Sequence, residues 1–132
     1  SAERSRDLST KVGCVITSPD SVIVSNGWND FPRGVDDTLD NRRLRPLKYL
    51  WTEHAERNAI YNAGRSGVSL RGCHMYLRWF SCCDCARAAI QAGISRILCT
   101  EPDWYDPNWG YQFRQSITML NQAGVEVVFF EK

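Results

Sequence analysis

The spacing of hydrophobic and polar positions changes along the chain, and it predicts the elements of the fold. Two short runs rich in β-branched residues, 12–17 and 21–26, predict strands joined by a turn at residues 18–20. Further on, apolar residues recur three times at helical spacing, and a short apolar run accompanies each helix. The predicted helices cover residues 54–63, 82–92 and about 111–123, and the strands after them cover residues 74–79, 94–99 and 125–130.

A hairpin followed by alternating helices and strands predicts an α/β fold around one mixed sheet. A glycine follows each predicted helix, and we expect Gly64, Gly93 and Gly124 to end these helices. Residues 1–10 are polar and charged, and we expect them to be the frayed end of a helix whose start is missing.

The stretch 27–48 is irregular and of mixed charge, and it leads directly into His54. A loop of this length in a compact domain is usually functional or disordered. We therefore expect this loop to face a substrate, and a solvated insertion is the alternative.

Composition places the chain among ordinary globular proteins. Its 132 residues are enough for one domain, 1–132, with one hydrophobic core. The net charge of +1 excludes the strong basic field of a typical polynucleotide-binding protein. No apolar run approaches the roughly 20 residues that span a bilayer, and no signal peptide is recognisable, so we expect a cytoplasmic protein with no membrane partner.

The six cysteines favour metal binding over disulfides. Cys82, Cys83 and Cys85 lie too close together for an ordinary disulfide framework. A chain without an export signal is expected to keep its thiols reduced, and reduced thiols are good metal ligands.

His54, Cys82 and Cys85 have the spacing of a zinc site. One imidazole and two thiolates make three protein ligands, which leave a fourth position for water and distinguish a catalytic zinc from a structural one. Glu56 lies two residues after His54, and such positions do not share a helix face. We therefore expect Glu56 to carry protons beside the metal instead of binding it.

A structural zinc site is the alternative from a different functional class, in a noncatalytic or regulatory module. It needs a fourth ligand, for which the candidates are Cys73, His74, Cys83 and Cys99. Cys83 is the nearest of these, but adjacent helical residues point about 100° apart. A structural site also has no use for Glu56, so we favour catalysis.

The chain resembles the deoxycytidylate deaminase branch of the cytidine deaminase superfamily over nearly its full length. The H-x-E and C-x-x-C motifs match the signature of zinc-dependent nucleobase deaminases. The other stretches that resemble this family are residues 5–13, the loop G-W-N-D-F-P-R-G at 27–34 followed by Asp36 and Asp37, and residues 54–60, 72–76 and 91–94.

This resemblance implies a cytidine deaminase-like three-layer α/β/α sandwich with a five-stranded mixed sheet. It implies one zinc ion per chain, hydrolysis of dCMP to dUMP and ammonia, and a homo-oligomer, either dimer or hexamer. The substrate contacts that we expect are Asn29, Arg33, Ala55, Trp79 and Ser81. Asn29 would bind the sugar and Arg33 the 5′-phosphate, with Arg43 and Arg45 as the next candidates. The alternatives with the same chemistry are another small aminated base or nucleoside, such as cytosine, guanine or cytidine, and a nucleic-acid base. The balanced charge disfavours the last of these.

Three positions depart from the family pattern: Ser81 replaces proline, Trp28 replaces tyrosine and Asp30 replaces glycine. Aromatic residues are also frequent in the stretches 79–80 and 102–109. We expect them near the mouth of the pocket, where they could stack on a base, and a role in the core or in an interface is the alternative.

Overall fold

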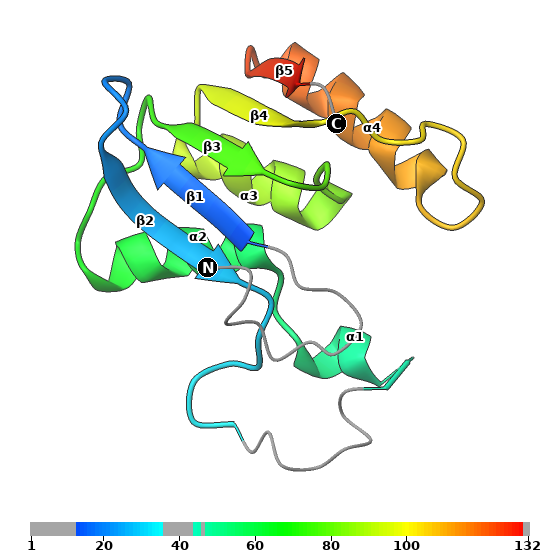
Figure 1. Ribbon diagram of the computed structural model, residues 1–132, viewed down its shortest axis with the longest axis horizontal. Coiled ribbons are helices and arrows are strands. Elements are labelled where there is room, and N and C mark those ends of the chain that lie inside the picture. Colours follow the sequence, from blue (N-terminus) through cyan, green and yellow to red (C-terminus); the bar gives the residue numbers. More distant parts are fainter. Residues whose placement is uncertain (1–12, 36–43, 46, 131–132) are drawn as a thin grey trace.

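The computed structural model describes residues 13–35, 44–45 and 47–130 (Figure 1). In chain order, the elements are β1 (Gly13–Thr17), β2 (Ile23–Trp28), α1 (Lys48–Trp51), α2 (Ala55–Arg65), β3 (His74–Leu77), α3 (Cys83–Ala92), β4 (Arg96–Thr100), α4 (Gly110–Gln122) and β5 (Glu126–Phe130). In the described part of the chain, no helix is long and apolar enough to cross a membrane.

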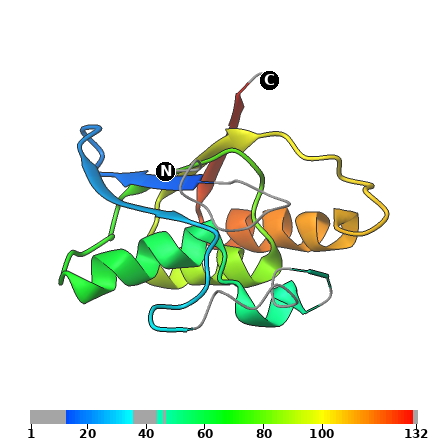
Figure 2. The same ribbon diagram turned by 60° about the horizontal axis from the view of Figure 1, so that its bottom comes forward.

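The five strands form one mixed sheet, as predicted, and their order in the sheet is β2-β1-β3-β4-β5. Strand β1 is antiparallel to β2 and β3, whereas β3, β4 and β5 are parallel. The chain passes from β3 to β4 to β5 in one direction across the sheet, and right-handed crossovers of this kind place their connecting helices on the same face. Figure 2 shows α2, α3 and α4 side by side below the sheet. Residues 1–12, where we expected the end of another helix, lie outside the described residues.

Alternate strand residues point into the layer between sheet and helices and form the core. Cys14, Ile16, Met75 and Ile97 are fully buried there. Helix α2 meets them with short side chains, since its buried residues are Ala55, Glu56, Ala59 and Ala63. These alanines let α2 approach β2 closely, which fixes the start of α2 against the sheet.

Two predicted helix ends are correct and one is wrong. Gly93 ends α3 in the left-handed conformation, with φ at 91°. Gly124 follows α4 with φ at 80°. Gly64, however, lies inside α2, which ends at Arg65. The positive φ occurs later, at Gly67.

The predicted loop 27–48 contains more regular structure than its sequence indicates. Strand β2 begins two residues later than predicted and continues to Trp28, because Gly27 and Trp28 pair with Cys14 and Gly13 of β1. A single helical turn, α1, begins at Lys48. The predicted strand residue Val12, and Arg43 with the acidic pair at 36–37, lie outside the described residues.

Candidate active site

The starts of α2 and α3 bring three metal-ligand atoms together. His54 is the N-cap of α2, Cys82 is the N-cap of α3, and Cys85 lies in the first turn of α3. The Nδ1 atom of His54 is 3.5 Å from the sulfur of Cys82 and 3.4 Å from that of Cys85. Tetrahedral zinc with bonds of about 2.3 Å to sulfur and about 2.0 Å to nitrogen separates two such atoms by about 3.5 Å. The three residues therefore fit one zinc ion.

The two thiols have opposite tendencies to ionise. Hydrogen bonds, first from the Cys85 thiol and then from His54, lower the pKa of Cys82 to about 4 although the residue is buried. The same contact with Cys82, together with burial, raises the pKa of Cys85. A thiolate at a helix N-terminus is further stabilised by the unpaired backbone N–H groups. The site is thus ready to bind a cation.

Glu56 lies in the first turn of α2, and only 8% of the residue is exposed. Burial raises the pKa of its carboxyl group, and the charge of His54 counteracts part of this effect. A buried carboxyl group with a raised pKa is suited to accept and return protons near neutral pH.

Comparison with known families identifies this arrangement. Residues 1–101 match the family described as the cytidine and deoxycytidylate deaminase zinc-binding region. The chain belongs to this family. It is therefore a zinc-dependent hydrolytic deaminase, and the predicted family, enzyme class and metal are confirmed. The noncatalytic alternative is set aside.

Individual relatives support the family assignment along most of the chain. An uncharacterized deaminase in the luxG 3′ region of Aliivibrio fischeri is 44% identical over 95% of this chain and 82% of its own length. Human deoxycytidylate deaminase is 36% identical over 95% of this chain and 70% of its own. The crystal structure of dCMP deaminase from cyanophage S-TIM5 in complex with dCMP and dUMP has a TM-score of 0.76 at 26% identity. The match covers 98% of this chain and 88% of the cyanophage chain. The cytidine deaminase-like α/β fold is thereby confirmed.

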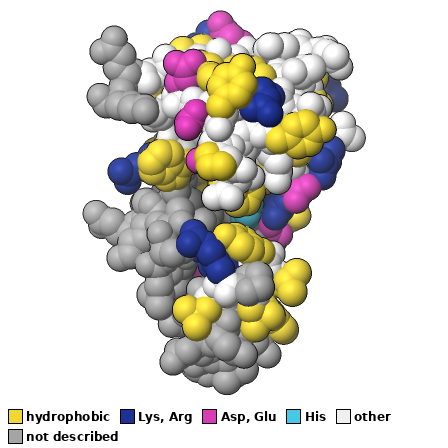
Figure 3. All heavy atoms as spheres, turned by 90° about the vertical axis from the view of Figure 1, so that its right-hand side faces the viewer, with side chains coloured by type: hydrophobic (Ala, Val, Ile, Leu, Met, Phe, Trp, Pro, Cys, Tyr) yellow, Lys and Arg dark blue, Asp and Glu magenta, His cyan; other side chains and the backbone are white. Residues whose placement is uncertain are grey.

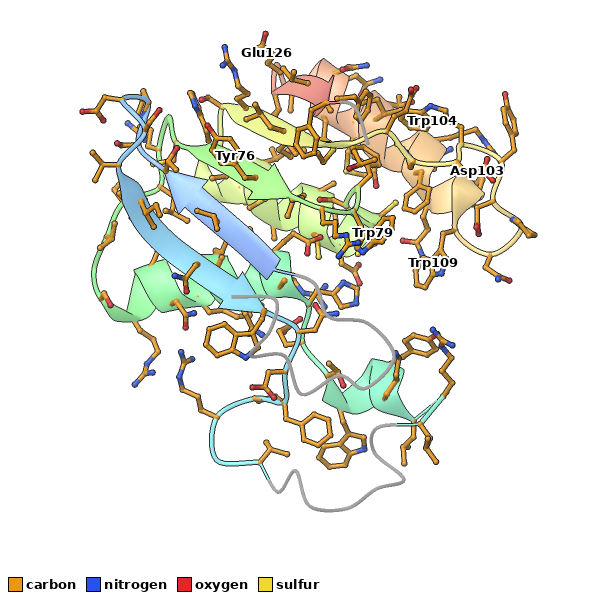
Figure 4. The ribbon with its side chains drawn as sticks, viewed as in Figure 1. Tyr76, Trp79, Asp103, Trp104, Trp109 and Glu126 are labelled. Atoms are coloured by element: carbon orange, nitrogen blue, oxygen red, sulfur yellow. The ribbon has the colours of Figure 1, made fainter. Side chains whose placement is uncertain are left out.

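Three of the predicted substrate contacts, Asn29, Ala55 and Ser81, lie beside the metal ligands, and a fourth, Trp79, lies at the surface. Asn29 is buried and accepts a hydrogen bond from the backbone N–H of Ala55 at 2.8 Å, at the start of α2. Ser81 directly precedes Cys82 and is fully buried, and its hydroxyl has no hydrogen-bond partner among the described residues. Trp79 is 54% exposed, and the Arg78 guanidinium lies 5.3 Å from its ring centre. Figure 4 shows Trp79 just beyond the end of β3.

Arg33 lies apart from this group. Its guanidinium donates a hydrogen bond to the side-chain oxygen of Asn62. Asn62 is eight residues after His54, which corresponds to about 12 Å along the helix axis. Arg33 there lines a surface cavity of about 240 Å³ together with Trp28, Glu53 and Tyr61. The next candidate, Arg45, donates from Nε to the hydroxyl of Tyr49 at 2.7 Å.

The aromatic residues after β4 divide between core and surface. Trp104 packs edge to face against Phe80 and Phe129, with ring centres 5.6 and 5.7 Å apart, so a position for Trp104 at the pocket mouth was wrong. Trp109 instead projects from the start of α4 and contacts Tyr49 of α1, with ring centres 6.4 Å apart (Figure 4). Figure 3 views the side where this loop lies, and hydrophobic side chains are spread there among Lys and Arg side chains.

Two of the departures from the family pattern interact with each other. The indole N–H of Trp28 donates to Oδ2 of Asp30 at 3.1 Å, and the backbone N–H of Phe31 donates to Oδ1 at 2.8 Å. The Asp30 carboxylate thus closes a tight turn around Asn29 and provides an acceptor for the larger Trp28 side chain.

Sequence reasoning missed the polar residues that surround the ligands. Glu53 accepts hydrogen bonds from the backbone N–H of His54 and from Arg57. The i, i+4 spacing of Glu53 and Arg57 is a recognisable sequence signal for an ion pair, although Glu53 lies just before α2 and pairs with Asp30 through its backbone. The partner of Arg57 on α3, Asp84, carries no such signal because it lies in a different helix.

Proposed function

We propose that the protein hydrolyses dCMP to dUMP and ammonia. The observation that carries this proposal is a three-ligand zinc site with the buried carboxyl group of Glu56 beside it. The choice of dCMP is supported by the human relative, named deoxycytidylate deaminase, and by the cyanophage enzyme, whose structure contains dCMP and dUMP.

In this proposal His54, Cys82 and Cys85 hold the ion and Glu56 moves the protons. Zinc bound here supplies the Lewis acidity that makes a water reactive near neutral pH. Glu56 accepts a proton from the attacking water as oxygen adds to C4 of the cytosine ring, and it delivers that proton to the ring nitrogen. Glu56 then transfers the remaining proton of the added oxygen to the exocyclic amine, the bond between C4 and this amine breaks, and ammonia leaves as the C4 carbonyl forms.

We assign substrate contacts to the residues around this centre. Asn29, which is fixed by its bond to Ala55, contacts the sugar. The Ser81 hydroxyl forms a hydrogen bond with the bound nucleotide or with a water beside it. This assignment is supported by the burial of that hydroxyl without a partner in the described part of the chain, since leaving such a group unsatisfied costs about 1–3 kcal/mol. The exposed Trp79 ring offers a surface on which a base can stack.

Arg33 remains our proposed phosphate ligand, with Arg45 as its competitor. Phosphate binding requires Arg33 to leave Asn62. Arg33→Ala and Arg45→Ala should be compared on dCMP and on deoxycytidine. The variant that loses the phosphate contact shows a raised KM for dCMP and an unchanged KM for the nucleoside. Unchanged KM values for dCMP in both variants contradict both assignments.

The substrate is tested by ammonia release from dCMP, CMP, deoxycytidine, cytosine, guanine and adenosine. The proposal predicts the highest kcat/KM for dCMP. Turnover of a free base or nucleoside together with inert dCMP contradicts the nucleotide assignment.

Three further features are proposals of the same kind: one deaminase domain over residues 1–132, a cytoplasmic location, and assembly as a dimer or hexamer. Light scattering coupled to size-exclusion chromatography tests the assembly. A monomeric mass at micromolar concentration contradicts it.

A further inference from the structure

The zinc ligands come from two different helix starts, so their geometry depends on how α2 and α3 are held against each other. The buried residues of these helices are mostly alanine: Ala55, Ala59 and Ala63 on α2, and Ala86 and Ala89 on α3. Such short side chains form shallow ridges and interlock weakly across a helix pair. Functional metal-ligand distances, in contrast, hold to within about 0.2 Å.

A polar bridge connects the two helix starts. Nε and Nη2 of Arg57 contact Oε1 of Glu53 at 2.6 and 2.5 Å, and Nη1 lies 3.3 Å from Oδ2 of Asp84. Among the ion pairs between described residues, this contact of Arg57 with Asp84 is the one that joins α2 to α3.

Both ends of the bridge attach to zinc ligands. At one end, Glu53 accepts the backbone N–H of His54 at 3.1 Å. The backbone of Glu53 also pairs with Asp30 through two hydrogen bonds of 2.8 and 3.2 Å, which ties the Asn29 turn to the same point. At the other end, Asp84 lies in the chain between Cys82 and Cys85. The bridge therefore runs from one ligand segment to the other.

The position of Arg57 also suits the charge of the site. Its side chain is only 20% exposed. A partly buried cation beside the two cysteines would offset part of the repulsion between their thiolates once both bind the metal ion.

We propose that Arg57 is a positioning residue that, through Glu53 and Asp84, holds the starts of α2 and α3 in the register that the zinc ligands require. The inference rests on the zinc site of the proposed function. Arg57 acts on the metal through its neighbours and does not touch the substrate.

Zinc release to a chromogenic chelator tests this bridge without relying on activity. The variants are Arg57→Gln, Asp84→Asn, their combination, and the conservative Arg57→Lys. Arg87→Gln is the matched control, because Arg87 also pairs with Asp84 but lies on α3 itself and is 59% exposed.

The expected result is at least about tenfold faster release for Arg57→Gln, since it breaks both contacts of a largely buried cation. Asp84→Asn, which affects an exposed pair, should accelerate release about two- to fivefold. Arg57→Lys should fall between wild type and Arg57→Gln, and Arg87→Gln should match wild type. In the Arg57→Gln background, Asp84→Asn should have no further effect.

Release at the wild-type rate from both single variants overturns the bridge. The bridge is also overturned if Asp84→Asn accelerates zinc release by the same factor in wild type and in the Arg57→Gln background. If Arg57→Gln does not fold, the comparison of Asp84→Asn with Arg87→Gln decides, and equal rates overturn the inference. A wild-type protein that binds no zinc overturns the proposed function as well, which separates that failure from a failure of the bridge alone.

Discussion

Replacing Gly27 by alanine tests how closely the zinc site depends on the contact between β2 and α2. Gly27 lies in β2 opposite Cys14 and faces the first turns of α2. A Cβ atom at this position would lie 2.5 Å from the backbone nitrogen of Ala59 and 2.6 Å from the carbonyl oxygen of Ala55. Both neighbours are helix backbone, so they cannot move away as a flexible side chain could.

The displacement can be worked out from these distances. Ordinary contacts of a Cβ atom begin at 3.4 Å, so α2 must move away from β2 by about 0.9 Å. Overpacking of this kind costs about 1–3 kcal/mol in the free energy of unfolding, which corresponds to a fall of about 3–12 °C in Tm for a chain of this size. Since the start of α2 carries His54 and Glu56, kcat/KM should also fall about tenfold to a hundredfold.

Thermal unfolding, zinc content and kcat/KM of Gly27→Ala should be compared with those of Gly64→Ala. Gly64 lies in α2, but a Cβ atom there meets no atom of the residues that the structure describes within 4 Å. This control should gain about 0.4–1 kcal/mol of stability, because alanine restricts the unfolded chain. If Gly27→Ala has the stability and kcat/KM of the control, then α2 is not held against β2 as described.

Three other variants test separate parts of the account. Burial raises the pKa of Glu56, so ionisation of its carboxyl group lowers the stability of the folded protein as pH rises. Without metal, the Tm of Glu56→Gln should therefore exceed that of wild type by more at pH 7 than at pH 4. An equal difference in Tm at both pH values contradicts burial as the cause. Ser81→Ala removes a buried hydroxyl that has no partner among the described residues, and it should raise Tm by about 3–12 °C while raising KM for dCMP; an unchanged KM removes Ser81 from the substrate contacts. In urea unfolding, Trp104→Ala should lose about 3 kcal/mol of stability, and Trp109→Ala, at the more exposed position, should lose less than about 1 kcal/mol. Equal losses contradict the division of these two residues between core and surface.

Local patterns were enough to predict the parts of the structure that depend on local physics. The strand and helix periods gave the sheet elements, and the spacing of His54, Cys82 and Cys85 gave the metal site. Gly93 was predicted correctly as a helix end, but Gly64 was not, because a glycine with ordinary φ can continue a helix. The turn α1 has too few residues to show a period.

Contacts between distant segments account for the rest. Nothing in the sequence distinguishes Trp104, which packs in the core, from Trp109, which lies near the surface, since both belong to one loop-rich stretch. The pairing of Arg57 with Asp84 depends on how α2 and α3 are placed side by side. Asp30 departs from the family pattern, and its role as an acceptor for Trp28 became clear only from the hydrogen bonds of the folded turn.

The most direct test of the central claim is product formation from dCMP by the zinc-loaded wild-type protein and by zinc-loaded Glu56→Gln. dUMP and ammonia should be quantified in the same reaction, and the zinc content of both proteins measured beforehand. We predict one dUMP and one ammonia per dCMP consumed by the wild type, and no detectable product from the variant although it retains about one zinc per chain. Absence of dUMP with the zinc-loaded wild type, or undiminished turnover in Glu56→Gln, contradicts the account.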